Sequence, residues 1–147
     1  MKRIILIIVI ISALGCQTKK DMNEQRKQVI ESYIKSYNNF DINGMTKDLT
    51  ENVVFENVSN GNVELRTEGI KEFIKQAESA KQYFTERKQT VQSWEFNNSK
   101  VIVGIDYKAI LAVDLPNGMK TGDTLKLKGK SEFEFANEKI KSITDKS

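Results

Sequence analysis

The segment LKLKGKSEFEF, residues 125–135, alternates between two kinds of side chain over its whole length. Successive residues of a β-strand point to opposite faces of a sheet, so this strand has one charged face and one mainly apolar face. The charged face holds Lys126, Lys128, Lys130, Glu132 and Glu134, and the other holds Leu125, Leu127, Gly129, Ser131, Phe133 and Phe135. The segment therefore predicts a sheet with water on one side and a core on the other.

The first part of the chain is typical of helices. From Val29 onward, apolar residues recur at helical spacing, which predicts a helix over about residues 22–38. A second, short helix is expected over residues 42–49, and Thr50 and Glu51 are expected to turn the chain.

The rest of the chain reads as strands interrupted by one helix. A strand is predicted over residues 52–58, a turn over 59–62 and a strand over 63–66, and the spacing from Ile70 predicts an amphipathic helix. Later breaks, which delimit antiparallel strands, fall at Asn97-Asn98, Pro116-Asn117-Gly118 and Asn137-Glu138. About three helices on one face of an antiparallel sheet make an α+β fold in a single domain.

The N-terminus has the layout of a signal peptide. Lys2 and Arg3 precede an apolar run that stops after about a dozen residues, short of the roughly 18 that a membrane span needs. Gly15 stands directly before Cys16, the only cysteine, and this end of the run resembles the lipobox of bacterial lipoproteins. The alternative is a chance cysteine or a buried thiol.

The lipobox resemblance implies a division of the chain and a location. Residues 1–15 would be the signal peptide, 16–26 the lipidated cysteine with a polar tether, and 27–147 the folded domain. Acyl chains on Cys16 would anchor the domain to a membrane of the bacterial cell envelope. Gln17 favours the outer membrane, with the domain facing the periplasm or the cell surface.

Composition excludes several classes of function. The chain has 23 Lys and Arg against 20 Asp and Glu. Lys2 and Arg3 would leave with the signal peptide, so the domain is close to neutral, which does not favour nucleic-acid binding. No histidine is present, and no phosphate-binding loop, dinucleotide fingerprint or metal-ligand cluster is found in the sequence. We therefore predict neither a cofactor nor a metal.

The order of the predicted elements resembles the nuclear transport factor 2-like superfamily, which includes SnoaL-like polyketide cyclases and ketosteroid isomerases. Three stretches carry the resemblance: residues 33–58, the helix-opening EGIKEFIKQ at 68–76, and GKSEFEFANEKIKSI at 129–143. The resemblance implies a cone, in which a strongly curved sheet wraps around helices and leaves a pocket between them.

The resemblance also assigns roles to single residues. Ketosteroid isomerases use a tyrosine of the first helix, which matches Tyr33, and an aspartate base, which falls on Asn57. Their second acid falls near Ser131. An amide cannot take up a proton in the working pH range, so this acid-base set is not retained.

Candidate pocket residues follow from the predicted strand faces and helices: Tyr33, Tyr37, Phe55, Asn57, Asp106, Ser131 and Phe133. The alternative is that the aromatic side chains simply fill the core. Asp106 is the one carboxylate inside an apolar strand, although Lys108 on the same face points to solvent. Asp145 lies where some SnoaL-like cyclases place an acid, but a frayed C-terminus is the simpler interpretation. Trp94 and Phe96 are expected to line the cone or to form a dimer surface.

Three hypotheses follow for the function. The first is a lipoprotein that binds a small apolar or amphipathic ligand, or a partner protein, without turnover. The second is an isomerase or cyclase acting on a lipid-like or polyketide-like substrate. The third is a homodimeric interaction module whose pocket is vestigial.

Overall fold

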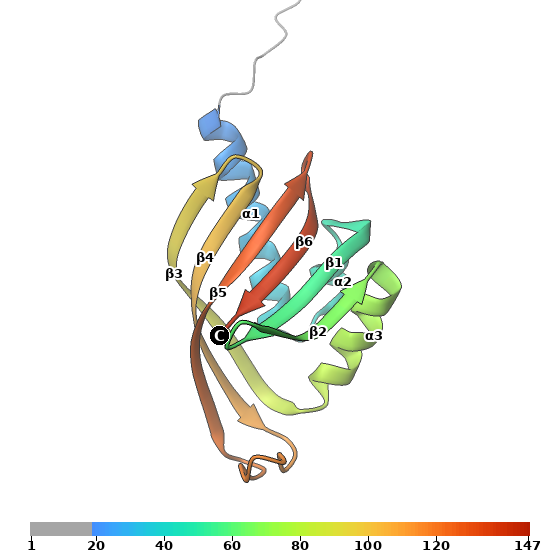
Figure 1. Ribbon diagram of the computed structural model, residues 1–147, viewed down its shortest axis with the longest axis vertical. Coiled ribbons are helices and arrows are strands. Elements are labelled where there is room, and N and C mark those ends of the chain that lie inside the picture. Colours follow the sequence, from blue (N-terminus) through green and yellow to red (C-terminus); the bar gives the residue numbers. More distant parts are fainter. Residues whose placement is uncertain (1–18) are drawn as a thin grey trace, which may run out of the picture.

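The computed structural model describes residues 19–147, so the predicted signal peptide and Cys16 lie outside the described residues. The chain runs in order through α1 Lys19–Asn38, α2 Ile42–Thr46, β1 Leu49–Ser59, β2 Asn62–Glu68, α3 Ile70–Lys81, β3 Phe84–Asn97, β4 Lys100–Leu111, β5 Thr124–Ala136 and β6 Lys139–Lys146 (Figure 1).

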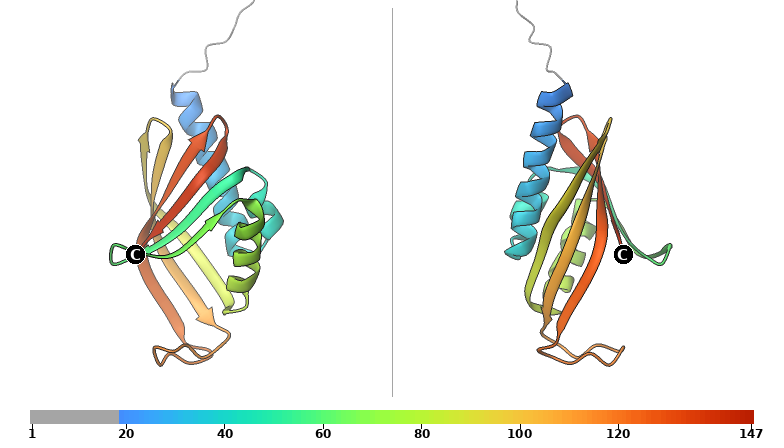
Figure 2. Two further views of the ribbon diagram at one scale, coloured as in Figure 1. Left: turned by 45° about the vertical axis from the view of Figure 1, so that its right-hand side comes forward. Right: turned by 90° about the vertical axis from the view of Figure 1, so that its left-hand side faces the viewer.

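The strands form one curved sheet in the order β2-β1-β6-β5-β4-β3. All neighbouring pairs are antiparallel except β1 and β6, which are parallel. Figure 2 shows the sheet bending, with α1 and α2 on one side of it and α3 beside β1 and β2. The α+β class and the cone shape predicted from the sequence are therefore confirmed.

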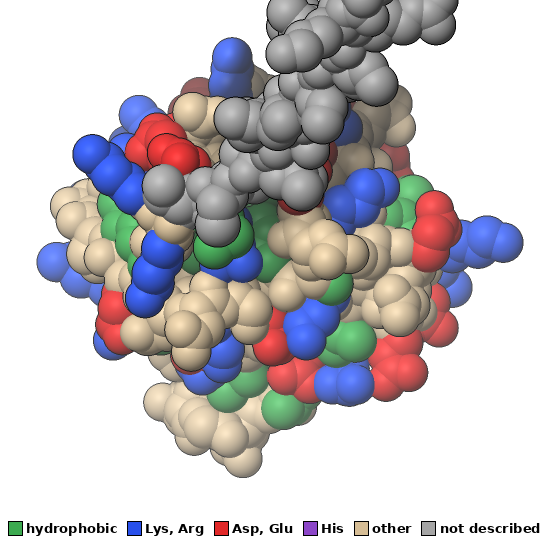
Figure 3. Space-filling model, turned by 90° about the horizontal axis from the view of Figure 1, so that it is seen from above, with side chains coloured by type: hydrophobic (Ala, Val, Ile, Leu, Met, Phe, Trp, Pro, Cys, Tyr) green, Lys and Arg blue, Asp and Glu red, His purple; other side chains and the backbone are tan. Residues whose placement is uncertain are grey.

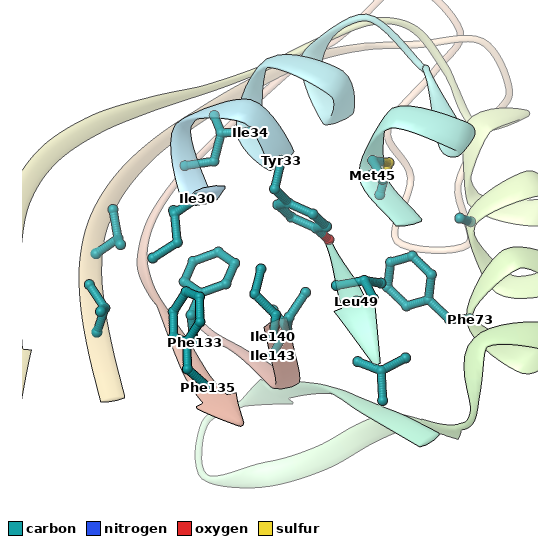
Figure 4. Packing of buried hydrophobic residues seen from close by; sticks show 14 of the residues in the cluster. Ile30, Tyr33, Ile34, Met45, Leu49, Phe73, Phe133, Phe135, Ile140 and Ile143 are labelled. Atoms are coloured by element: carbon teal, nitrogen blue, oxygen red, sulfur yellow. The ribbon is translucent and has the colours of Figure 1, made fainter. Parts of the chain in front are cut away.

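The apolar face of β5 packs into the core as its alternation predicts. Phe133 and Phe135 are buried and meet Ile30 and Ile34 of α1 together with Ile140 and Ile143 of β6 (Figure 4). The lysines of β5 are exposed on the opposite face. The inner face of β5 therefore forms one wall of the interior.

Two boundaries differ from the expected ones. Helix α1 begins at Lys19, three residues before the expected start at about residue 22, so most of the expected polar tether is helical. Its first turns are exposed and carry no apolar stripe, but their Lys, Glu, Gln and Arg residues favour helix. Thr50 and Glu51 do not turn the chain, because β1 begins at Leu49, where the strand pairs with Ile140.

The predicted turns after β1, β3 and β5 are confirmed. Asn60, Asn98 and Asn137 each adopt a positive φ of about 50°, a conformation that asparagine tolerates better than most residues. These three tight turns fix the register of the β1–β2, β3–β4 and β5–β6 hairpins.

The end of the molecule where α1 begins carries charged side chains of both signs, with small separate hydrophobic areas between them (Figure 3). Among residues 19–147, no helix is long and apolar enough to cross a membrane.

Candidate functional site

A cavity of about 360 Å³ lies inside the cone, at the end away from the start of α1. Its walls are the second half of α1, parts of α2 and α3, and the inner faces of the six strands. The cavity exists because the inner side chains of β5 become smaller along the strand, from Phe133 to Ser131 to Gly129. The same strand therefore fills one half of the cone and leaves the other half hollow.

Gly129 also allows two backbones to approach closely. A Cβ atom at this position would lie 2.3 Å from the carbonyl oxygen of Lys146, so no other residue fits without a shift. The end of β6 can therefore lie against β5, and this contact positions the residue before Lys146 beside Ser131.

Asp145, the residue before Lys146, is the middle member of a row of three polar residues on neighbouring strands, which we call the polar row. Ser131 of β5, Asp145 of β6 and Asn57 of β1 are direct neighbours in register. Ser131 Oγ donates a hydrogen bond of 2.6 Å to Asp145 Oδ1. Asn57 is exposed at the mouth, whereas Ser131 is buried, so the row runs from solvent into the cavity.

The environment of Asp145 alters its ionisation. Burial raises the pKa of this carboxyl to about 6, and the hydrogen bond from Ser131 partly opposes the increase. Within residues 19–147 it is the only Asp or Glu side chain that lines the cavity. A carboxyl with a pKa near neutrality can both take up and release a proton at working pH, as a general acid or base must.

Three tyrosines face the same space. Tyr33 and Tyr37 come from α1 and Tyr107 from β4, and Tyr37 Oη donates to Tyr107 Oη at 3.4 Å. Burial raises the pKa of all three hydroxyls, so they stay protonated and can donate hydrogen bonds to a ligand. Gln89 also lines the cavity, and its buried Oε1 atom accepts no hydrogen bond from the described residues.

Most other lining residues are apolar, among them Met45, Phe55, Leu65, Phe73, Ala77, Phe84, Ile105, Leu125 and Leu127. Apolar walls with a few convergent polar groups are the usual form of a small-molecule site. In the described part of the chain, no cluster of three or more acidic or sulfur ligands forms that could hold a metal ion.

The model of the SnoaL-like domain matches residues 30–143, which contain most of the fold and nearly all of the cavity. The chain belongs to the SnoaL-like domain family. A search of curated proteins gave no match.

Solved structures share the fold of this SnoaL-like domain at low sequence identity. A putative polyketide cyclase from Xanthomonas campestris superposes with a TM-score of 0.72 at 16% identity, over 86% of this chain and 92% of the other. AclR, a putative hydroxylase from Streptomyces galilaeus, gives 0.66 at 20% identity, over 84% and 88%. A putative SnoaL-like polyketide cyclase from Jannaschia gives 0.69 at 11% identity, over 83% and 84%.

The SnoaL-like domain brings together five of the seven residues expected in the pocket: Tyr33, Tyr37, Phe55, Asn57 and Ser131. Phe133 does not line the cavity but fills the core below Tyr33, with ring centroids 5.7 Å apart. Asp106 does not line it either. Its neighbours Ile105 and Tyr107 do, so the alternation of the strand places Asp106 on the outer face, opposite Lys128.

Asp145 does not lie on a frayed end, because β6 continues to Lys146 and Asp145 is half-buried. Trp94 and Phe96 stack with ring centroids 6.1 Å apart and pack against the core, with Lys27 of α1 over Trp94. The pair therefore lies on the helix side of the sheet and does not line the cavity.

Proposed function

We propose that this SnoaL-like domain is a proton-transfer enzyme of the isomerase or cyclase type, with Asp145 as its acid-base group. The observation that carries the proposal is a carboxyl with a pKa of about 6 inside a largely apolar cavity. Strongly shifted ionisable groups in clefts are candidates for catalysis. Two solved structures with similar folds are named putative polyketide cyclases, which supports the same class of chemistry.

Asp145 replaces the base that the superfamily resemblance assigned to Asn57. The two residues are register neighbours, so a carboxylate on β6 reaches the same part of the cavity as one on β1. In the proposed reaction, Asp145 removes a proton from a carbon next to a carbonyl group, and a tyrosine hydroxyl donates a hydrogen bond to the oxygen that gains charge. The substrate is a small, mainly apolar carbonyl compound.

Proton exchange on a model ketone tests this directly. In D2O, the domain should accelerate deuterium uptake at the α-carbons of 2-tetralone, followed by NMR. Asp145→Asn should lose about 10²- to 10⁴-fold of the acceleration, since that is what a general base contributes. Asp106→Asn is the matched control, because it changes the same functional group on the outer face.

A second function, ligand binding without turnover, is favoured by the amide at Asn57 and by the absence of histidine. The same experiment separates the two. Binding of 2-tetralone without accelerated exchange would favour ligand binding without turnover and contradict the enzyme. Undiminished exchange by Asp145→Asn would contradict the assignment of Asp145 as the acid-base group.

We also propose that Cys16 is acylated and anchors the domain to the cell envelope, as the lipobox resemblance implies. The cavity lies at the end away from the start of α1, a helix of 20 residues, or about 30 Å. In the anchored protein, the cavity would therefore lie on the side away from the membrane. Mass spectrometry of the N-terminal peptide from the membrane fraction should find a diacylated Cys16, and Cys16→Ser should move the protein to the soluble fraction.

A further inference from the structure

Arg87 of β3 is a buried cation without an anionic partner among residues 19–147. The residue is 5% exposed. Its Nε donates to the backbone carbonyl oxygen of Tyr37 at 2.8 Å, and its Nη2 lies 3.9 Å from Sδ of Met45. No carboxylate of residues 19–147 forms an ion pair with it. Buried charges are normally paired, so this guanidinium lacks the anionic group that usually accompanies a buried cation.

Two aromatic rings hold the guanidinium in place. Its central carbon lies 3.8 Å from the ring centroid of Tyr37 and 4.4 Å from that of Phe40. Such stacking offsets part of the cost of burial, but the faces of the rings supply no anion for the donors in the plane of the guanidinium. The rings therefore fix the orientation of the cation, as a preformed binding group requires.

Arg87 adjoins two hollows, the cavity and a groove that Phe40 also lines. The groove is lined by Glu86, Lys88 and Lys108, among others. Three observations favour the cavity. First, Nη2 approaches Met45, which lines the cavity but not the groove. Second, the charge of Arg87 acts on two tyrosines of the cavity, where it opposes the increase that burial causes in the pKa of Tyr33 and of Tyr107. Third, the carboxylate of Glu86 lines the groove, where it would repel an anionic ligand.

Arg87 and Asp145 lie in different parts of the cavity. Buried Tyr33 and Met45 line the cavity near Arg87, while exposed Leu127 and Asn57 mark its mouth. The pKa of Asp145 responds to burial and to Ser131, whereas those of the tyrosines respond to Arg87 as well. The cavity thus has a cation at its buried end and Asp145 in its polar row.

The geometry points to Arg87 as the receptor for an anionic group, so that the natural ligand is an amphipathic acid whose carboxylate, or an equivalent oxyanion, lies between Arg87 and the tyrosine hydroxyls. A carboxylate accepts two parallel hydrogen bonds from a guanidinium, and the fixed orientation of Arg87 favours this pairing. The apolar part of the ligand then extends past Phe55 and Phe73 toward the mouth. This inference deepens the proposed function and depends on it only in placing a ligand in the cavity.

A pair of probes that differ only in charge provides the test. We would measure binding of 2-naphthoate and of 2-naphthamide to residues 17–147 at pH 7.5 by isothermal titration calorimetry. The wild type should bind the carboxylate at least about tenfold more tightly than the amide. Arg87→Met should lose this preference while its affinity for the amide changes by less than about threefold. Lys88→Gln, which removes a neighbouring exposed cation of the groove, should keep the preference.

Each other result has a distinct meaning. Equal binding of the two probes by the wild type would overturn the inference and leave a cavity that binds neutral ligands. Loss of the preference in Lys88→Gln but not in Arg87→Met would place the anion in the groove, which also overturns it. Failure of both probes to bind the wild type would contradict the proposed function as well. Because Arg87→Met removes a stacking partner, Arg87→Lys serves as a second variant. It should keep more of the preference than Arg87→Met does.

Discussion

The two halves of the cone interior are built from the same elements, but one half is filled with side chains and the other is hollow. Near the start of α1, Phe133 and Phe135 of β5 fill the interior against Ile30. Toward the other end, Ser131 and Gly129 of the same strand leave a cavity of about 360 Å³. The filled half stabilises the fold, and it supports a hollow half in which the half-buried Asp145 and the buried Arg87 form no ion pair with any of residues 19–147. Stability and binding are thus separated along one strand.

The largest expected effect is in the filled half. Phe133 is 1% exposed, so Phe133→Ala should lower the free energy of unfolding by about 3–5 kcal/mol. Leu127, on the same face of β5 in the hollow half, is 43% exposed, and Leu127→Ala should cost less than about 1 kcal/mol. Urea denaturation followed through the single tryptophan, Trp94, measures both. Similar losses in the two variants would show that the halves are not energetically distinct.

In the hollow half, removal of a charge should stabilise the protein. Burial raises the pKa of Asp145 to about 6, against about 4 for an unfolded aspartate. The folded state therefore binds the proton more tightly, which stabilises it below about pH 4, and this contribution is lost as the pH rises through 6. At pH 7, Asp145→Asn should be more stable than the wild type by about 1–3 kcal/mol, with the gap closing toward pH 4.

Urea titrations of Asp145→Asn and of the matched variant Asp106→Asn between pH 4 and pH 8 would check this prediction. A constant gap, or a variant less stable than the wild type at pH 7, would show that Asp145 is better solvated than its position indicates. Tyr33, Tyr37 and Tyr107, whose hydroxyls respond to the charge of Asp145, remain neutral over this range because burial raises the pKa of each.

A smaller effect is expected where the two halves meet, at Ser131. Its hydroxyl donates to Asp145 and lowers the pKa of that carboxyl, so Ser131→Ala should raise this pKa above 6. Loss of a hydrogen bond to the ionised group should also cost about 1–2 kcal/mol at pH 7, and less at pH 4. Carboxyl ¹³C NMR titration reports the pKa. An unchanged or lowered pKa would mean that the bond does not favour the ionised form.

The sequence predicts the filled half better than the hollow half, for a physical reason. The alternation of residues 125–135 and the helical spacing after Ile70 are local patterns, so they predict β5 and α3 without knowledge of their partners. The turns at Asn60, Asn98 and Asn137 are local as well. These signals were enough to predict the order of the elements and the class of the fold.

The site depends on contacts between distant segments. Asp145 stands two residues from the C-terminus in a charged stretch, and only its register with Ser131 and Asn57 places it in the cavity. Arg87 lies in a polar segment that reads as exposed, and it is buried because Tyr37 and Phe40 from the end of α1 stack on it. Within β6 itself, the signal for Asp145 was its spacing of two residues from the apolar residue Ile143, which the strand buries.

The smallest expected effect concerns the polar row itself. Asn57→Asp would place a second carboxylate beside Asp145 in register, and a like charge raises the pKa of its neighbour. Because Asn57 is exposed, water and salt screen the repulsion, so the increase should stay below about one pH unit and should shrink at high ionic strength. NMR titration of Asp145 in low and high salt measures it, with the neutral exchange Asn57→Ser as control. A salt-dependent increase would mean that the mouth of the cavity adjusts the ionisation of Asp145. No increase would mean that the row is only a geometric alignment and that Asp145 depends on burial and Ser131 alone.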